Sequence, residues 1–331
     1  MTSAYDIIGD IHGCAETLVR LLERMGYQKV CGVYQHSSRK VIFLGDVLDR
    51  GPRIREALQL VHDMVMAGHA EMIMGNHEYN AIGYCTKARP GSGREYLREH
   101  DERHTRQIAE TLEQFANHPE DWKAYLAWFK DLPLFLEKPS FRVVHACWDN
   151  DLISRYLRQY RSNQVDMDFI HASVDKLSFA GILMDRLTRG TDMPLPGGGS
   201  MTSKDGYERQ FFRTRFWGNE PKVYNDVIFQ PDPLPNEIGE LAISEDDRSR
   251  ISQYSASAKP LFVGHYWLNE SPKPLAANVA CLDYSAVKYG RLAAYRMDGE
   301  ATLSTDKFVW VYVDQHHVDE APHEGGPNEL G

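Results

Sequence analysis

The amino-acid sequence predicts an α/β fold in which short buried strands alternate with amphipathic helices. Runs of strand length, rich in Val, Ile and Phe and bounded by glycine or polar residues, occur at 5–10, 40–46, 71–76, 141–146 and 260–265. Between the first three runs, residues 14–27 and 54–69 carry apolar side chains at the three-and-four spacing of helices. Strands that alternate with helices in this way build an α/β sheet.

Two segments interrupt this alternation. Residues 86–130 are charged and amphipathic, which predicts a helical segment between strands. Residues 150–258 form a long insertion that contains the Gly/Pro/Ser-rich loop 193–206. Within it, the loop 187–217 is either an ordinary surface insertion or a lid, in which a glycine-rich hinge precedes the arginines and aromatic residues of the sequence YERQFFRTRFW.

The chain has 331 residues, which is enough for one large domain with insertions or for two domains. We expect a single domain over residues 1–318. Near its end, residues 277–285 and 290–297 are predicted to form a pair of strands. The Gly- and Pro-containing tail at 319–331 is predicted to be disordered.

Composition and charge narrow the class of protein. A net charge of −10 provides no basic footprint for duplex nucleic acid. No apolar run reaches the ~18 residues of a membrane span, and the N-terminus has no basic segment followed by an apolar one. Five cysteines without a CxxC pair predict neither a disulfide framework nor a structural zinc site. We therefore expect a cytoplasmic protein, and the sequence leaves its oligomeric state open.

Each of the five apolar runs ends in a side chain that can bind a metal ion: Asp10 with His12, Asp46, Asn76, His145 and His265. Ligands of open α/β sheets bind beyond the carboxyl ends of the strands, so these side chains should converge. A mixture of oxygen and imidazole ligands suits Mn, Fe or Zn better than Ca. Six ligands are too many for one ion that also holds a water molecule, but they fit two ions that share a carboxylate.

The same residues lie in a series of motifs that resembles the calcineurin-like metallophosphoesterases: GDIHG (9–13), GDVLDRG (45–51), GNHE (75–78), VHA (144–146) and GH (264–265). The DRG element resembles the phosphoprotein-phosphatase branch, which includes bacterial Ser/Thr phosphatases and symmetrical diadenosine tetraphosphatases. The resemblance implies a four-layer α/β/β/α sandwich of two mixed sheets, to which this chain adds the helical segment and the long insertion.

The resemblance also divides the six ligands between two divalent metal ions, which we expect to be manganese, with iron or zinc as alternatives. The first ion would be bound by Asp10, His12 and Asp46. The second would be bound by Asp46, Asn76, His145 and His265, so that Asp46 would bridge the two ions.

Catalytic roles follow from the same resemblance. Arg50 would bind phosphate oxygens, for which a planar guanidinium is well suited. His77, oriented by Asp49, would protonate the leaving group, because a histidine beside a carboxylate is a tunable proton donor. The family has a second substrate-binding arginine, for which this chain offers Arg186, Arg189, Arg213 and Arg215. We favour Arg213 or Arg215, which lie in the sequence FFRTRFWG.

The predicted function is that of a phosphatase, a dinuclear-metal phosphoesterase in which a metal-bound hydroxide attacks phosphomonoesters of phosphoproteins or small molecules directly. Cys147 and Trp148 stand where the family has small residues, which leaves the substrate open. Nucleotides or dinucleoside polyphosphates of the diadenosine tetraphosphate type are alternatives, and Trp148 and Trp217 are candidates for stacking a base. A second alternative is a non-catalytic, metal-binding regulatory module.

Overall fold

The structure is a computed structural model, and it describes residues 4–202, 208–218, 220–230 and 233–313. Contacts within the chain divide it into two compact units. The first contains the described residues up to Arg189 and from Lys259 onwards, and the second contains those of Gly190–Ala258. The predicted disordered tail at 319–331 lies outside the described residues.

Two mixed sheets form the centre of the first unit. The larger sheet has the order β16 (Phe308–Tyr312), β15 (Arg291–Met297), β1 (Ala4–Ile8), β4 (Arg39–Phe43) and β5 (Ala70–Met72). In this sheet β1, β4 and β5 are parallel, and β15 and β16 are antiparallel to their neighbours. The smaller sheet has the order β14 (Val279–Cys281), β13 (Leu261–Val263), β7 (Arg142–Val144) and β6 (Phe135–Glu137).

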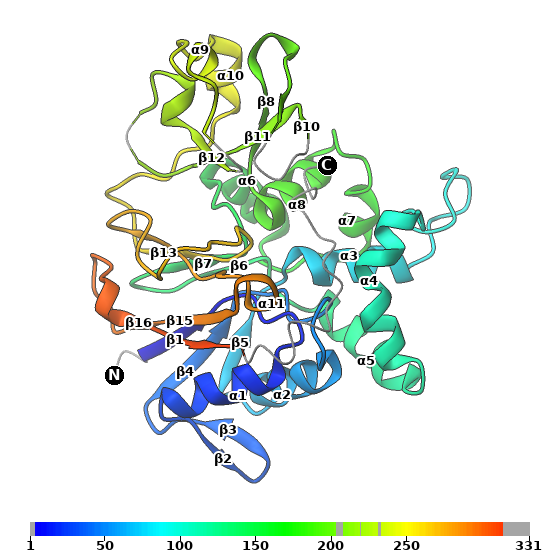
Figure 1. The fold of residues 1–331 in the computed structure, drawn as a ribbon. Coiled ribbons are helices and arrows are strands. Elements are labelled where there is room, and N and C mark those ends of the chain that lie inside the picture. The colour runs from blue at the N-terminus through cyan, green and yellow to red at the C-terminus, as the bar shows by residue number, and fades with distance from the viewer. Residues whose placement is uncertain (1–3, 203–207, 219, 231–232, 314–331) are drawn as a thin grey trace. The chain divides into compact units, whose positions relative to one another are not determined.

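Helices cover the outer faces of both sheets. Figure 1 shows α1 (Ala15–Arg24) and α2 (Ile54–Met66) against the larger sheet, and α6 (Asn150–Tyr160) and α8 (Phe179–Arg189) beyond the smaller one. The core between the sheets is apolar: Ile42 belongs to the same buried cluster as Val143 and Phe262 of the smaller sheet. The predicted α/β/β/α sandwich of two mixed sheets is therefore confirmed.

The segment 86–130 is helical only from Glu102 onwards. After α3 (Asn76–Cys85), residues 86–101 form turns and bends with an isolated bridge between Lys87 and Tyr96. Within this stretch Gly91 and Gly93 adopt positive φ values that a right-handed helix does not contain. The side chain of Asp101 then caps α4 (Glu102–Phe115) by accepting a hydrogen bond of 2.7 Å from the His104 amide. The helix α5 (Pro119–Lys130) completes the segment.

The predicted pairing of residues 277–285 with 290–297 is wrong. The strand β14 pairs with β13 in the smaller sheet, whereas β15 lies between β1 and β16 in the larger one. All three residues of β14 are buried, so its sequence has no alternation of polar and apolar residues from which a partner or a face could be inferred.

The remaining elements are short. The first unit also contains β2 (Gln28–Val30), β3 (Val33–Gln35), α7 (Met167–Ala172) and α11 (Ala286–Tyr289). The second unit contains β8 (Asp192–Pro194), β9 (Met201–Thr202), β10 (Glu208–Arg209), β11 (Phe211–Thr214), β12 (Ile228–Gln230), α9 (Asn236–Gly239) and α10 (Glu245–Arg250). It has its own apolar cluster around Phe212. Among the described residues, no helix combines the length and the hydrophobicity that crossing a bilayer requires.

A buried charge network joins the three central strands of the larger sheet. Asp6 on β1 is fully buried, and its Oδ1 accepts hydrogen bonds from Arg39 Nε on β4 (2.9 Å) and Arg296 Nε on β15 (3.1 Å). Its Oδ2 accepts a third bond from the Tyr27 hydroxyl at 3.0 Å. Burial, together with the Asp6 charge, raises the pKa of Tyr27, so this hydroxyl keeps its proton.

We expect Asp6→Asn to lower the free energy of unfolding by about 3 kcal/mol, because the neutral amide leaves the Arg39 guanidinium, 11% exposed, without its buried counter-charge. Urea denaturation measures this change. The matched control is Glu16→Gln, which removes an ion pair to Arg53 that is 46% exposed on both sides. The control should cost less than about 1 kcal/mol, and equal effects of the two variants would contradict the assigned role of Asp6.

Candidate metal centre

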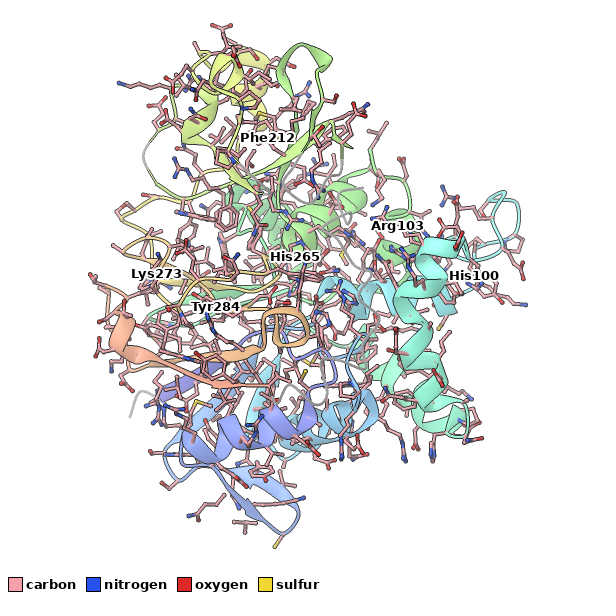
Figure 2. All side chains as sticks on the ribbon, in the orientation of Figure 1. His100, Arg103, Phe212, His265, Lys273 and Tyr284 are labelled. Atoms are coloured by element: carbon pink, nitrogen blue, oxygen red, sulfur yellow. The ribbon has the colours of Figure 1, made fainter. Side chains whose placement is uncertain are left out.

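The six predicted metal ligands converge inside the first unit. They follow or begin the elements that the sequence motifs predict: Asp10 and His12 after β1, Asp46 after β4, Asn76 at the start of α3, His145 after β7 and His265 after β13. All six are buried, and the most exposed of them, His265, is 6% exposed. Figure 2 labels His265.

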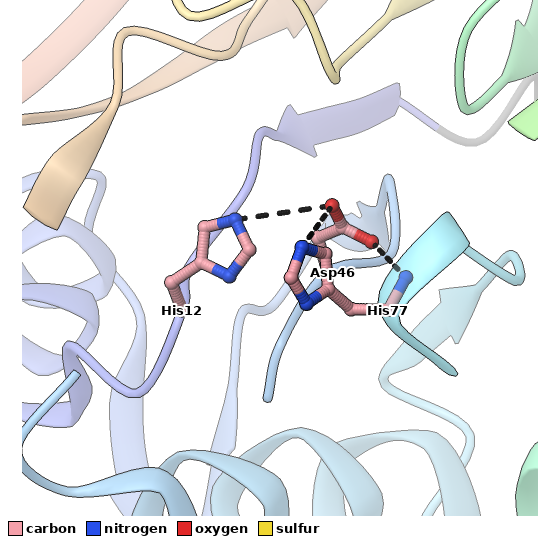
Figure 3. A group of neighbouring side chains, drawn as sticks. All are labelled: His12, Asp46 and His77. Carbon is pink, nitrogen blue, oxygen red and sulfur yellow. Dashed lines mark hydrogen bonds and ion pairs between the residues drawn. The ribbon is translucent and has the colours of Figure 1, made fainter. Parts of the chain in front are cut away.

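Asp46 lies at the middle of this group. Its Oδ2 is 3.8 Å from His12 Nε2 and 3.9 Å from His77 Nε2. Figure 3 marks these two contacts with dashed lines. The same oxygen is 3.4 Å from His145 Nε2. Two overlapping groups of atoms that could hold a metal ion result, His12–Asp46–His77 and Asp46–His145–His265, and within each group the atoms lie within 4.8 Å of one another. The first group contains the predicted proton donor His77 in place of the predicted ligand Asp10. Asp46 is common to both groups, as a bridging carboxylate requires.

Backbone carbonyl groups orient two of the imidazoles. The Nδ1 atom of His12 lies 2.9 Å from the Leu48 carbonyl oxygen, and the Nδ1 atom of His145 lies 2.7 Å from that of Leu44. An Nδ1–H that donates to a carbonyl leaves Nε2 as the atom with the free lone pair. In both residues Nε2 faces Asp46, so the tautomer that suits a metal ligand is the one that the backbone selects.

The other ligands complete a cluster of electron-donating atoms. Asn76 Oδ1 lies 3.0 Å from His145 Nε2 and 2.9 Å from His265 Nδ1. The His265 amide donates to Asp10 Oδ2 at 3.1 Å. Asp10 Oδ1 and His12 Nε2 are buried and have no hydrogen-bond partner among the described residues. Buried polar atoms of this kind fit divalent cations, which would accept their lone pairs.

The electrostatics of the centre also fit cations. Burial and the charges of Asp283 and Asp46 raise the pKa of Asp10 well above its usual value. Burial would raise the pKa of Asp46 as well, but His145 and His77 hold it well below its usual range. Burial and the Arg50 charge lower the pKa of His12, which keeps it neutral and able to bind a metal. The centre thus crowds carboxylates together in a buried space that positive charge would stabilise.

The loops that carry the ligands have an unusual backbone. His12, Asp46 and His265 have φ values of 44°, 51° and 70°, in the left-handed region that non-glycine residues seldom adopt. Neighbouring glycines allow the loops to approach closely. A Cβ atom on Gly75 would lie 2.2 Å from Asp46 Oδ1, and one on Gly264 would lie 2.1 Å from Asp10 Oδ1. The glycines that precede Asn76 and His265 therefore make room for a carboxylate of another motif.

Glu78, to which the sequence analysis gave no role, holds two of these loops together. Its side chain is fully buried and accepts hydrogen bonds from the Gly75 and Asp46 amides with Oε2, at 2.9 and 2.8 Å, and from the Val47 amide with Oε1, at 2.9 Å. The motif GNHE indicates this contact, because a glutamate at the third helical position can accept a hydrogen bond from the backbone amide of the residue before the helix.

The predicted pair of His77 and Asp49 is present in the structure. His77 Nδ1 lies 2.6 Å from Asp49 Oδ2, which leaves Nε2 directed towards Asp46. Thr111 on α4 supports this arrangement by donating to Asp49 Oδ1 and by accepting from the Asp49 amide at 3.1 Å. Burial alone would lower the pKa of His77, but the Asp46 charge and the Asp49 hydrogen bond outweigh burial and raise it. These contacts favour a protonated imidazole.

Arg50 is positioned by an aromatic ring that the sequence analysis did not identify. Its guanidinium carbon lies 4.1 Å from the centre of the Trp267 ring, within the range of a cation–π contact. Trp267 is fixed in turn by Asp283, a buried carboxylate that accepts hydrogen bonds of 2.8 Å from the Trp267 and Ser285 amides. Asp283 lies after β14, so its link to Arg50 connects motifs that are far apart in the sequence.

The remaining predicted residues belong to other elements of the chain. Arg213 and Arg215 are in or beside β11 of the second unit, where Arg213 contacts Gln230 and Asp192 and Arg215 donates to the Asp226 carbonyl. Their substrate-binding roles, and that of residues 150–258 as a lid, stay predictions. Trp148 is 2% exposed and packs against Phe135 and Arg142. Because the side chain is buried, its ring contacts other side chains of the protein and is not open for stacking a base.

Comparison with known proteins agrees with this geometry. The calcineurin-like phosphoesterase family matches residues 5–175 of this chain. The bis(5'-nucleosyl)-tetraphosphatase PrpE (asymmetrical) of Oceanobacillus iheyensis is 49% identical over 73 residues, which cover 22% of this chain and 29% of the relative. The protein of the same name from Bacillus subtilis is 40% identical over 75 residues, which cover 22% of this chain and 31% of the relative.

These matches to the tetraphosphatases thus span less than a third of their length. Among solved structures, the cold-active protein-tyrosine phosphatase of a psychrophilic Shewanella species aligns with a TM-score of 0.50 and 19% identity. The alignment covers 94% of this chain and 80% of that one, and it shows a likeness of fold.

We expect Glu78→Gln to weaken metal binding at least tenfold, because an amide has one acceptor oxygen where the carboxylate serves three backbone amides. Titration of the metal-free protein with Mn²⁺ in a calorimeter measures the affinity. Glu113→Gln, a conservative change on α4 outside the centre, is the matched control. An unchanged affinity in the Glu78 variant would show that the two loops keep their geometry without it.

We expect Trp267→Leu to raise KM for a phosphate ester about fivefold with a smaller change in kcat, since a cation–π contact contributes roughly 0.5–2 kcal/mol to the position of Arg50. Steady-state kinetics separates the two constants. Trp310→Leu on β16, outside the centre, tests for a general effect of losing a tryptophan. Equal changes in both variants, or a fall in kcat alone, would contradict the positioning role.

Proposed function

The chain belongs to the calcineurin-like phosphoesterase family, and on that premise we propose that it hydrolyses phosphomonoesters at the centre around Asp46. One observation carries the proposal: a buried carboxylate lies within 4 Å of three imidazole Nε2 atoms, and one of these imidazoles is hydrogen-bonded to a second carboxylate. This arrangement combines a set of metal ligands with a proton donor in one small volume.

Two divalent cations fit the donor set, and their ligands would be Asp10, His12, Asp46, Asn76, His145 and His265. Such ions would supply positive charge that stabilises the phosphoryl oxygens and activates the nucleophile. The mixture of carboxylate, amide and imidazole donors favours manganese, with iron or zinc as alternatives. Asp46 would be the shared ligand, because it is the residue common to both groups of atoms.

The protein's own residues would bind the ester and manage the proton of the leaving group. Arg50, held over Trp267, would bind phosphate oxygens through its fork of N–H groups. His77 would donate the proton on Nε2 to the leaving oxygen, since its Nδ1 is engaged by Asp49. Asp49 would keep the imidazole oriented and stabilise its charge, and Thr111 would hold Asp49 in place.

A second candidate function is hydrolysis of dinucleoside polyphosphates. The observation in its favour is the identity of 49% over 73 residues with a protein named as a tetraphosphatase. Trp148 would not stack a base in this case, because it is buried. A screen of p-nitrophenyl phosphate, phosphopeptides, nucleotides and diadenosine tetraphosphate with added Mn²⁺ tests both functions, and Asp46→Asn provides the blank. The products to measure are inorganic phosphate from the monoesters and mononucleotides from diadenosine tetraphosphate. Release of either product that persists in this variant would contradict the proposed centre.

We expect His77→Ala to reduce kcat more for esters with poor leaving groups than for those with good ones, because only a basic leaving oxygen needs a proton in the transition state. The loss should be about a hundredfold or more for phenyl phosphate and about tenfold for 2,4-dinitrophenyl phosphate. His118→Ala removes an imidazole that is 41% exposed and should change neither rate. Equal losses for both esters would show that His77 does not donate the proton.

A further inference from the structure

Two arginines of the first unit bind the same amide oxygen on α3. Arg98 Nη1 donates to Asn80 Oδ1 at 2.8 Å, and Arg189 Nη2 donates to the same atom at 2.6 Å. Arg98 comes from the loop before α4, and Arg189 is the last residue of α8. Two guanidinium groups are thereby brought together by a neutral acceptor, which cannot offset their mutual repulsion.

The position of Asn80 places this pair next to the metal centre. Asn80 lies four residues after Asn76 and three after His77 on the same helix. Side chains three and four residues apart share one helix face, and four residues advance the helix by about 6 Å. The arginine pair is therefore about one helical turn from a predicted metal ligand and from the predicted proton donor.

Both arginines are held in place by the surrounding structure. Arg189 lies 5.6 Å from the centre of the Tyr79 ring and 3.2 Å from Asp185 Oδ1, and its side chain is 14% exposed. The Tyr79 hydroxyl is fixed by the Ser173 hydroxyl at 2.6 Å. Arg98 also donates to Gln107 Oε1 at 2.9 Å. A pre-ordered pair of this kind loses little conformational entropy when it binds a ligand.

The surroundings of the pair are cationic. Lys176 Nζ lies 3.7 Å from the Asp185 oxygen that Arg189 also approaches, so one carboxylate serves two cations. Burial and the charges of Arg189 and Arg98 act to lower the pKa of Lys176, which shows that positive charge is concentrated here. The Asp101 carboxylate, which also interacts with Arg98, is used to cap α4.

We propose that Arg98 and Arg189 form a second anion site, which binds a phosphate group of the substrate beyond the one that is attacked. This inference rests on the proposed function of the centre around Asp46. Of the two candidate substrate classes it favours the second, substrates with a polyphosphate chain, because a site about one helical turn away suits the next phosphates along such a chain. Paired guanidinium forks match phosphate oxygens in charge and in geometry.

The test compares a substrate with one phosphate and a substrate with several. In Arg98→Gln, kcat/KM for diadenosine tetraphosphate should fall about tenfold or more, mainly through KM, because a charge-assisted hydrogen bond is lost. For p-nitrophenyl phosphate it should stay within about twofold. Arg98→Lys, which keeps the charge without the fork, should show an intermediate loss. Arg106→Gln, an exposed arginine on α4, removes the same charge and should change neither substrate.

Inhibition gives a second readout. Inorganic tripolyphosphate should inhibit hydrolysis of p-nitrophenyl phosphate, and Arg98→Gln should raise its inhibition constant about tenfold while leaving that of inorganic phosphate unchanged. Equal constants for tripolyphosphate in the wild type and the variant would overturn the second site and leave the phosphatase proposal intact. Hydrolysis of phosphopeptides with acidic flanking residues is measured in the same variant. If Arg98→Gln lowered kcat/KM for these peptides and left that for diadenosine tetraphosphate unchanged, the polyphosphate assignment would be overturned.

The two proposals fail in different ways. If the wild-type protein with Mn²⁺ hydrolysed no ester, the proposed function would fall. Direct binding of tripolyphosphate, measured by calorimetry on the same protein, would still decide the second site. Weaker binding by Arg98→Gln and Arg189→Lys than by the wild type would support the pair, and equal binding would reject it. Thermal unfolding of each variant establishes that it is folded.

Discussion

The candidate metal centre depends on the contact between the Glu78 carboxylate and the loop after β4. Asp46 has to lie within reach of three imidazoles, and its backbone adopts a φ of 51° in order to do so. A residue in this conformation persists only where its surroundings over-determine it. Glu78 provides that constraint, because its oxygens accept hydrogen bonds from the amides of Asp46 and Val47 and from the amide of Gly75, the residue before α3. The orientation of the central ligand thus follows from a residue that does not itself face the site.

That constraint has an electrostatic consequence. Glu78, Asp10, Asp46 and Asp283 are all nearly or fully buried within one region. Burial and the Asp46 charge raise the pKa of Glu78 to about 7, and burial raises the pKa of Asp283. Carboxylates that raise one another's pKa are costly in an apolar interior unless cations accompany them. Metal binding would therefore stabilise the first unit, because two of these crowded carboxylates, Asp10 and Asp46, are predicted metal ligands.

The positions of the predicted ligands could be anticipated from the sequence because each of them lies at or just beyond the end of an apolar run, and four of the six directly follow a glycine. In an α/β sheet such a local signal also specifies position, since parallel strands end at one edge. The supporting residues carried no such signal. Thr111, Trp267 and Asp283 lie in a helix and in loops of ordinary composition, and they reach the site only through the packing of the chain. The strand β14 shows the same limit, because three buried residues do not specify which sheet they join.

The helix α3 links these observations, because consecutive residues on it serve different parts of the site. Asn76 and His77 face the centre, Glu78 turns back to the two loops, and Asn80 binds the arginine pair. A helix is rigid over a single turn, so the distance between the metal centre and the pair is set by backbone geometry. A substrate that contacted both the metal centre and the arginine pair would therefore bind to two sites whose separation is already fixed in the free protein. Selectivity for polyphosphate chains would then come from this fixed spacing, with no closing movement required.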